Sequence, residues 1–509
     1  MLATVLSYGI SGIDGFPVRV EVNISAGLPM FDVVGLPDAA VKESRERVRT
    51  ALKNSGYGFP DDRITVNLAP ADMKKEGPVF DLPIAVGVVA GDGQLPVARL
   101  NDTVIIGELS LDGSVRPMRG ALPITISAME QGVKSIILPE QSAQEVRCVE
   151  GIDVLPAAHL RDVIAHLRGE KLIAPMEKVS YQKLLSERTG AFDFAHVFGQ
   201  VSAKRALEIA AAGGHNALMI GPPGSGKTLL ARCLPTIMPD MTFEEALEVT
   251  RIHSVAGITP ESGLLIERPF RSPHHTASSV AIVGGGTAAL PGEISKAHHG
   301  VLFLDELPEY KRDVLEVLRQ PMEDGFVTVT RVGAQSTYPA QFMLICSMNP
   351  CPCGHFGSRT TQCRCTPMQI RRYLNKISGP LLDRIDIHIE VESIPAERIA
   401  QAISEEPSTD IRERIDAARA VQRERYKGKQ IACNARLNAK TLNTYCEMTE
   451  AATEALKQAS EALGLSNRAF TRVMKVARTI ADLDGVEIID ADQVMEAIQY
   501  RTLDRKYWG

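Results

Sequence analysis

Aromatic residues are scarce in this chain, which has a single tryptophan and only 5% Phe, Trp and Tyr in total. No apolar run approaches the roughly 20 residues that a membrane-spanning helix needs. The N-terminus also lacks a basic segment followed by a sustained apolar one, so neither a leader nor a membrane partner is predicted. We expect a cytoplasmic protein.

A strong charge of one sign is missing as well, since the formal net charge is −6 over 509 residues. Nucleic-acid binding, if present, must therefore come from a local patch or from the channel of an oligomer.

An even cysteine count is missing too: there are nine cysteines, and four of them lie within residues 351–365. This favours reduced thiols or a metal site over a disulfide framework. The length predicts two to four domains.

The first third of the chain has the pattern of an α/β domain. Val18, Val20, Val22 and Ile24 alternate with polar residues, as in a half-buried strand. A helical stretch begins at Pro37-Asp38 and reaches Leu52, and further strands are predicted at 64–68, 104–107 and 135–138, with helical patterns between them. We place the end of this unit near Gly169 and a linker after it.

A glycine-rich octet of the pattern GxxxxGKT lies in the middle of the chain. A short apolar strand at 216–220 precedes it and a helical pattern from Leu229 follows it, which is the context that a phosphate-binding loop requires. Its backbone N–H groups can bind a polyphosphate, while Lys227 reaches the β and γ oxygens and Thr228 ligates Mg²⁺. The predicted nucleotide-binding residues are Gly221, Pro222, Pro223, Gly224, Ser225, Gly226, Lys227 and Thr228.

Two carboxylates follow a second apolar strand at 300–304, a run typical of a strand buried on both faces of a parallel sheet. Asp305 would hold the Mg²⁺ with its water shell, and Glu306 would polarise the attacking water as general base. The alternative is a solvated acidic pair at the start of a helix from Pro308 to Leu315. A third buried strand, 342–348, ends at Asn349, whose amide can bind the γ-phosphate and the water, although Asn-Pro also commonly marks a turn.

These motifs resemble the AAA+ ATPases. Residues 193–200, ending in Gln200, are similar to the element that lies against the adenine; an ordinary helix start is the equal alternative for this segment. Asn349 matches the position called sensor 1. The segment 378–386 is similar to the one that carries the arginine finger, so the resemblance implies that Arg384 enters a neighbouring subunit's site; a salt bridge with Asp383 or Asp386 is the alternative. Arg468 matches sensor 2, with Arg472 as the competing choice.

The segments 271–276 and 290–300 further resemble the magnesium-chelatase-like branch of AAA+ proteins, and the whole chain resembles the ComM/YifB family. That resemblance implies a hexameric, ATP-driven DNA helicase that moves branched DNA during homologous recombination and natural transformation. The implied fold is an AAA+ P-loop ATPase core with a helical lid, preceded by a Lon-protease-like α/β domain. The predicted blocks are 1–169, 170–192, 193–395 and 396–509.

The N-terminal block resembles the proteolytic domain of Lon in three phrases, at 41–44, 67–78 and 107–113. The resemblance places Val79 at the position of the nucleophilic serine and Ile124 at that of the catalytic lysine. Neither side chain can perform that chemistry. We therefore expect a structural or partner-binding module and not a protease.

Four cysteines form two CxC pairs, Cys351 with Cys353 and Cys363 with Cys365. Two pairs of thiolates that meet across a hairpin can make a structural zinc site, and reduced free thiols are the equal alternative. The adjacent histidines at 274–275 and 298–299 lack a carboxylate cluster in the sequence. We assign them to structure or to subunit contacts.

The sharper DNA candidate is a predicted hairpin at 326–335, because related ring ATPases have a hairpin there that enters the central channel. Arg331 on this hairpin and Lys296 in the preceding segment are the predicted phosphate contacts, with Arg268 and Arg271 as further candidates; ordinary surface charge is the alternative. A chelatase-type or chaperone-like motor that remodels a protein partner is the rival function. The loop sequence Gly-Ala-Phe-Thr-Gly-Ala of sigma-54-type activators is absent.

Overall fold

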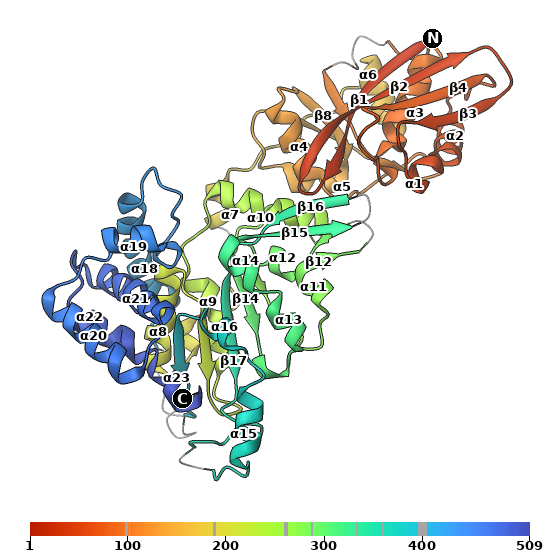
Figure 1. Cartoon of the computed structure of the whole chain (residues 1–509). Coiled ribbons are helices and arrows are strands. Elements are labelled where there is room, and N and C mark those ends of the chain that lie inside the picture. The colour runs from red at the N-terminus through yellow and green to blue at the C-terminus, as the bar shows by residue number, and fades with distance from the viewer. Residues whose placement is uncertain are drawn as a thin grey trace. The chain divides into compact units, whose positions relative to one another are not determined.

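The computed structural model describes residues 1–96, 100, 102–186, 190–258, 263–286, 289–331, 334–358, 361–394 and 405–508. The chain divides into two compact units (Figure 1). The first unit contains Met1–Arg188, Thr242–Ile266 and Gly333–Tyr338, and the second contains Thr189–Met241, Glu267–Val332 and Pro339–Gly509. Within the described residues, none of the helices combines the length and apolar character needed to cross a bilayer.

The first unit is built on a mixed seven-stranded sheet of order β3-β4-β2-β1-β5-β8-β9. Strands β1 and β2 pair antiparallel, while β1, β5, β8 and β9 run parallel. The alternation predicted for 18–24 is confirmed, because Val18, Val20 and Val22 are buried, Ile24 is half-buried, and the residues between them are exposed or half-buried. The strands are β1 (Leu2–Ser11), β2 (Asp14–Ser25), β3 (Met30–Val34), β4 (Arg63–Ala69), β5 (Thr103–Ile105), β8 (Ser135–Pro139) and β9 (Asp153–Ala157).

Some helices of this unit begin or end at a capping residue. The helix predicted from Asp38 to Leu52 is interrupted at Glu43, and Asp38 caps the first piece by accepting from the N–H of Val41 at 2.8 Å. Gly169 ends α6 with a φ of +78°. The helices are α1 (Ala39–Lys42), α2 (Ser44–Asn54), α3 (Asp81–Gly91), α4 (Ala121–Glu130), α5 (Glu140–Ala143), α6 (Leu160–Arg168), α7 (Tyr181–Ser186) and α10 (Phe243–Ala256).

Helix α10 comes from the middle of the chain but belongs to the first unit, and the sequence pattern gives no indication of this. Ser254 accepts from the backbone N–H of Gly120 at 3.1 Å and donates to Glu145 at 2.9 Å. Arg251 forms ion pairs with Asp14 and Glu130. The insertion is thus held by buried hydrogen bonds as well as by surface charges.

The second unit has a parallel five-stranded sheet of order β11-β14-β17-β10-β18. The three strands predicted around the motifs are confirmed as β10, β14 and β17, and all of their residues are buried. The strands are β10 (Ala217–Ile220), β11 (Phe270–Arg271), β14 (Val301–Leu304), β17 (Met343–Met348) and β18 (Ile387–Glu390). Apart from the two large sheets, strands β15 (Phe326–Arg331) and β16 (Ala334–Pro339) pair in a two-stranded sheet, as the predicted hairpin requires.

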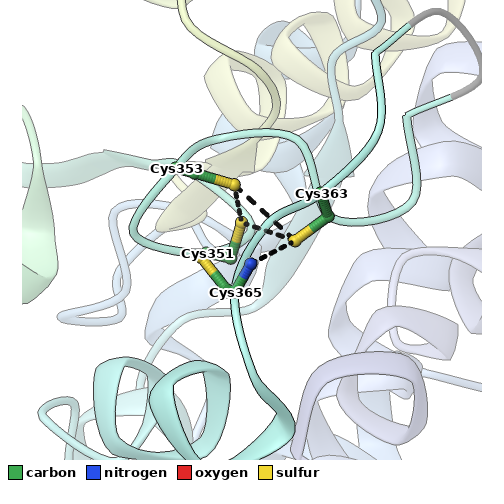
Figure 2. Close-up of side chains that lie close together, drawn as sticks. All are labelled: Cys351, Cys353, Cys363 and Cys365. Carbon is green, nitrogen blue, oxygen red and sulfur yellow. Dashed lines mark hydrogen bonds between the residues drawn. The ribbon is translucent and has the colours of Figure 1, made fainter.

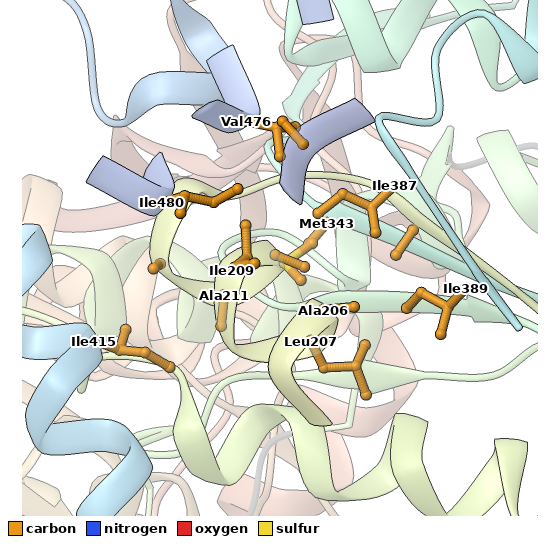
Figure 3. Packing of buried hydrophobic residues seen from close by; sticks show 14 of the residues in the cluster. Ala206, Leu207, Ile209, Ala211, Met343, Ile387, Ile389, Ile415, Val476 and Ile480 are labelled. Atoms are coloured by element: carbon orange, nitrogen blue, oxygen red, sulfur yellow. The ribbon is translucent and has the colours of Figure 1, made fainter. Parts of the chain in front are cut away.

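Helix α8 (Val201–Gly213) lies at the centre of this unit's core, and every residue from Ala206 to Gly213 is buried. It packs against β18, α9 (Lys227–Ile237), α18 (Ser408–Arg425) and α21 (Asn467–Asp484). Figure 3 shows side chains from these elements and β17 meeting around α8: Ala206, Leu207, Ile209, Ala211, Met343, Ile387, Ile389, Ile415, Val476 and Ile480. The C-terminal region, predicted as a helical lid, is helical: α19 (Ala439–Tyr445), α20 (Glu450–Leu463), α21, α22 (Ala491–Gln499) and α23 (Thr502–Trp508).

Candidate functional site: a phosphate loop at the edge of the parallel sheet

Three neighbouring strands of the second unit bring the predicted motifs to one edge. In the parallel register, Ile220 of β10 faces Met348 of β17, and Leu304 of β14 faces Cys346 of β17. The phosphate loop, the acidic pair and Asn349 follow directly after these strands. Ligands of open parallel sheets bind at this carboxyl edge. Motifs that are far apart in the chain are therefore brought together in a single cluster of polar groups.

The phosphate loop leads into helix α9, which begins at Lys227, two residues before the predicted start at Leu229. Gly224 and Gly226 have φ values of +76° and +89°, a region that side-chain-bearing residues avoid. A Cβ on Gly221 would lie 2.2 Å from the carbonyl oxygen of Val391, so only glycine fits there. The helix N-terminus and the backbone amides of the loop make this turn suited to a polyphosphate.

Lys227 is buried beneath the loop. Its Nζ donates to the carbonyl oxygens of Gly221 at 2.8 Å and Pro222 at 2.7 Å. Burial lowers the pKa of Lys227, although the carboxylates of Asp305 and Glu306 raise it. The ammonium group is thus held at the loop by carbonyl dipoles, from which it can turn to phosphate oxygens.

Thr228 and Asp305 are adjacent, as a shared magnesium site requires. The Thr228 hydroxyl donates to Asp305 Oδ2 at 3.0 Å, and the Ser347 hydroxyl donates to the other carboxylate oxygen. Mg²⁺ prefers such hydroxyl and carboxylate oxygens and keeps several waters. The donor set therefore fits a magnesium ion. Ser347 was missed by the sequence reasoning, although its place near the end of a buried strand beside Asp305 was the available signal.

Glu306 is exposed, and its backbone has a φ of +55°, a strained conformation for a residue with a side chain. Its Oε2 lies 3.4 Å from Nδ1 of His275, so one of the paired histidines contributes to this site. The helix predicted from Pro308 to Leu315 is wrong in its extent. A short 3-10 turn ends at Glu309, Tyr310 is extended and donates to the Pro273 carbonyl at 2.5 Å, and α13 (Arg312–Glu316) begins later.

Asn349 and Gln200 complete the surroundings of the loop. Asn349 Oδ1 lies 3.5 Å from Lys227 Nζ, so the residue after β17 reaches the phosphate loop. Gln200 donates to the carbonyl oxygens of Ser225 at 3.1 Å and Glu392 at 2.6 Å. These contacts fix the segment before α8 against the loop.

Arg384 is not free in the single chain. It is almost fully buried, donates to the Pro380 carbonyl at 2.6 Å and forms a short ion pair with Glu323. The predicted alternative partners, Asp383 and Asp386, are not its partners among the described contacts. Glu323 was missed because it lies 61 residues away in a segment without a recognisable motif.

The two candidates for sensor 2 have different surroundings. Arg472 forms an ion pair with the buried Asp386, which also binds His215 at 3.1 Å. The pKa of Asp386 is held far below its usual range by Arg472 and His215, against the effect of burial. Arg468 is exposed at the start of α21. Arg472 therefore has a structural partner, and Arg468 is accessible to a ligand.

Three of the predicted DNA contacts have partners of their own within the chain. Lys296 is half-buried and pairs with Glu293 at 3.2 Å, which also pairs with Arg271 at 2.7 Å. Arg268 donates to the carbonyl oxygens of Pro239 and His299. Arg331 ends strand β15, and its side chain is outside the described part of the structure.

The four cysteines of the two CxC pairs converge (Figure 2). The Sγ atom of Cys351 lies 3.4 Å from that of Cys353 and 3.7 Å from that of Cys363, and the Cys353–Cys363 distance is 3.6 Å. All four sulfur atoms lie within 4.8 Å of one another. The loop thus brings together the ligands that the sequence placed in two separate pairs.

Comparison with known proteins covers nearly the whole chain. The family model described as "Magnesium chelatase, subunit ChlI" matches residues 193–399, "Subunit ChlI of Mg-chelatase" matches 20–142, and "Magnesium chelatase, subunit ChlI C-terminal" matches 405–501. The chain is 44% identical over 505 residues to an uncharacterized protein, YifB, of Salmonella typhimurium, covering 99% of this chain and 98% of the relative.

A second relative is competence protein ComM of Haemophilus influenzae, which is 43% identical over 506 residues, with 99% of this chain and 98% of the relative covered. A more distant similarity, 28% identity over 124 residues, links 24% of this chain to 22% of Lon protease 2 of Bacillus subtilis. These similarities confirm the family inferred from the motifs. The chain belongs to the ComM/YifB family of magnesium-chelatase-like AAA+ proteins with a Lon-like N-terminal region.

Proposed function

We propose that the protein hydrolyses ATP with Mg²⁺ at the edge of the parallel sheet. The observation that carries the proposal is that Lys227 lies within hydrogen-bond distance of Asn349, and Thr228 within hydrogen-bond distance of Asp305, at one edge of the sheet. Lys227 and the loop amides bind the β and γ phosphates, and Thr228 and Asp305 hold the metal. The bound magnesium ion neutralises charge on the phosphates.

Two side chains would act on the attacking water. Glu306 is exposed at the rim of the site and accepts the water's proton as general base. Asn349 hydrogen-bonds to the γ-phosphate and orients the same water. His275, in contact with Glu306, positions that carboxylate.

We propose that the site is shared between copies of the chain in a homo-oligomer, with a hexameric ring as the expected form. Arg384 would stabilise the developing charge on the phosphate of the neighbouring subunit. For this, the Arg384 guanidinium must leave the carboxylate of Glu323 and bind the phosphate instead, so one anionic partner replaces another. Arg468 would contact the nucleotide within its own subunit.

The ring would act on DNA as a helicase that promotes branch migration in homologous recombination and natural transformation. Membership of a family that includes a protein named for competence supports this proposal. The hairpin of β15 and β16 would enter the channel, with Arg331 as the phosphate contact and Lys296 as a weaker candidate because Glu293 neutralises it. We propose a cytoplasmic location, where such DNA is found.

A second candidate function is the remodelling of a protein partner by a chelatase-type motor. The match of residues 193–399 to a magnesium chelatase subunit favours it. In that case the first unit, whose Lon-like positions are apolar, would be the adaptor for the partner.

The experiment compares ATP hydrolysis and strand displacement with and without forked and four-way DNA. We expect both DNAs to stimulate hydrolysis and to be unwound, and Glu306→Gln to abolish both effects while the protein still assembles. If the assembled wild-type protein hydrolyses ATP but DNA neither stimulates it nor is unwound, the helicase proposal fails and the remodelling motor replaces it.

A further inference from the structure

We propose that Cys351, Cys353, Cys363 and Cys365 hold one structural zinc ion. Four sulfur atoms at about 2.3 Å from a tetrahedral zinc lie roughly 3.8 Å from one another. The Sγ distances of 3.4, 3.6 and 3.7 Å come close to this value. They exclude a disulfide between these pairs in this structure, since an S–S bond measures about 2.05 Å. The described cysteines are all free thiols.

The loop backbone is arranged to support thiolates. The N–H of Phe356 donates to Sγ of Cys351 at 3.3 Å, and the N–H of Cys365 donates to Sγ of Cys363 at 3.4 Å. Such donors orient metal-bound sulfur and spread its negative charge. Gly354 and Gly357, with φ values of +82° and +77°, allow the chain to turn back toward the sulfur cluster.

The ligand type indicates the metal and its role. Four thiolates select zinc or iron among the common metals, and a site with four protein ligands leaves no position open for a substrate. Cys351 is buried and the other three are partly covered, in keeping with a closed site. The metal would therefore hold the loop in shape and take no part in a reaction itself.

The position of the loop gives this zinc a consequence for the ATP site. Cys351 follows Asn349 after a single proline, so the ligand and the candidate sensor share one short segment. A Cβ on Gly354 would come 2.6 Å from Cδ of Pro223 in the phosphate loop. The zinc loop thus braces both Asn349 and the phosphate loop, an inference that rests on the proposed ATP hydrolysis.

The first experiment measures metal bound to the full chain purified with a thiol reductant and without chelators. We expect about one zinc per chain in the wild type and less than about 0.1 in the double variant Cys363→Ser, Cys365→Ser. Cys363→His should keep the zinc, because Cys₃His is also a zinc set. Cys446→Ala, at a buried cysteine outside the loop, is the matched control and should keep it as well.

Replacement of the metal by Co²⁺ gives a second readout, since tetrahedral thiolate ligation produces characteristic visible absorption. We expect these bands in the wild type and in Cys446→Ala, and their absence in the double serine variant. Iron in place of zinc, no metal in the wild type, or equal metal in the double variant and the wild type would each overturn the proposal.

The second experiment separates metal binding from bracing. Gly354→Ala and Gly357→Ala introduce the same backbone strain, but only the first meets Pro223, since nothing lies within 4 Å of a Cβ on Gly357. We expect both variants to keep the zinc, with ATP hydrolysis reduced about tenfold or more only in Gly354→Ala. Equal effects of the two substitutions would contradict the bracing role. Zinc content does not depend on hydrolysis, so it remains readable if the proposed function fails.

Discussion

Each unit has a segment that leads into a helix beside a sheet, but the side chains there are polar in the second unit and apolar in the first. In the second unit, Lys227 and Thr228 at the start of α9 lie within hydrogen-bond distance of Asn349 and Asp305, respectively, at the sheet edge. In the first unit, Val79 comes just before α3 and packs against two hydrophobic clusters. The second unit thus has polar side chains at the start of this helix, and the first unit has an apolar side chain at the comparable position.

The first unit has an apolar side chain at the second position that the Lon resemblance matches to a catalytic residue. Ile124 is fully buried in α4, and Leu247 of α10 packs against the same cluster. Helix α4 therefore supports an insertion from the middle of the chain where a protease would hold its lysine. A buried carboxylate of this unit, Asp81, forms an ion pair with Arg47 at 2.6 Å and serves the fold.

The largest expected effect is on chemistry in the second unit. Glu306→Gln should reduce ATP hydrolysis by about 10²- to 10⁴-fold, because the amide cannot accept the water's proton. Glu309→Gln, an exposed carboxylate on the same segment, and Val79→Ala in the first unit should change the rate less than about twofold. Phosphate release under steady-state conditions gives the comparison. A Glu306→Gln rate near that of the wild type would contradict the role of Glu306 as general base.

The next effect is on stability in the first unit. Ile124→Ala should destabilise this unit by about 2–5 kcal/mol, since it leaves a cavity in a packed cluster. Leu28→Ala, at a side chain that is 88% exposed, should cost less than about 0.5 kcal/mol. Hydrogen exchange of β1 and β2 reports on this unit, because the single tryptophan lies in the other one. Equal protection in both variants would mean that α4 is not a packing element.

A smaller contrast lies within the second unit. Arg468→Ala should lower ATP hydrolysis by about 10- to 100-fold without loss of stability, since an exposed guanidinium would lose only its contact to the nucleotide. Arg472→Ala should instead lower the unfolding temperature, because it leaves the buried Asp386 without its ion pair. Hydrolysis and the Trp508 fluorescence transition are measured on both variants. The reverse pattern would make Arg472 the sensor.

The smallest effect is the pH dependence of the first unit. Burial raises the pKa of Asp81 in the folded chain from the ordinary value of 3.8 to about 6, although the ion pair with Arg47 lowers it. The folded state thus binds this proton more tightly, so the stabilisation exists at low pH and is lost as the pH rises through about 6. Between about pH 4.5 and 5.5 the wild type should lose about 1 kcal/mol relative to Asp81→Asn. Exchange of β1 and β2, corrected for intrinsic rates, tests this; parallel pH profiles would contradict it.

Much of the ATP site was predictable because its residues act through local sequence. The phosphate loop, Asp305 and Asn349 each follow a short apolar strand, and a parallel sheet brings such strand ends together without further information. The partners of these groups were not predictable. Ser347, His275 and Glu323 depend on packing between segments far apart in the chain, and no local pattern encodes that distance.

In the fold, too, features set by local sequence were predictable and features set by distant packing were not. The strands recognised by their alternating or fully apolar patterns were correctly predicted, although the helix predicted from Asp38 to Leu52 is two helices. The position of α10 was not predicted, because its side chains have an ordinary amphipathic pattern that does not specify which core it joins. The break at Tyr310 was missed for a similar reason, since a tertiary hydrogen bond to Pro273 favours the extended backbone over helix propensity.

The central claim is that two copies of the chain share each ATP site, and a mixing experiment tests it most directly. Lys227→Ala lacks the phosphate contact and Arg384→Ala lacks the finger, so each variant alone should be inactive. In mixed rings, an intact phosphate loop from one variant meets an intact arginine from the other. We predict that the mixture hydrolyses ATP at least about tenfold faster than either variant alone. Rates in the mixture no higher than the average of the two, with assembly intact, would contradict a shared site.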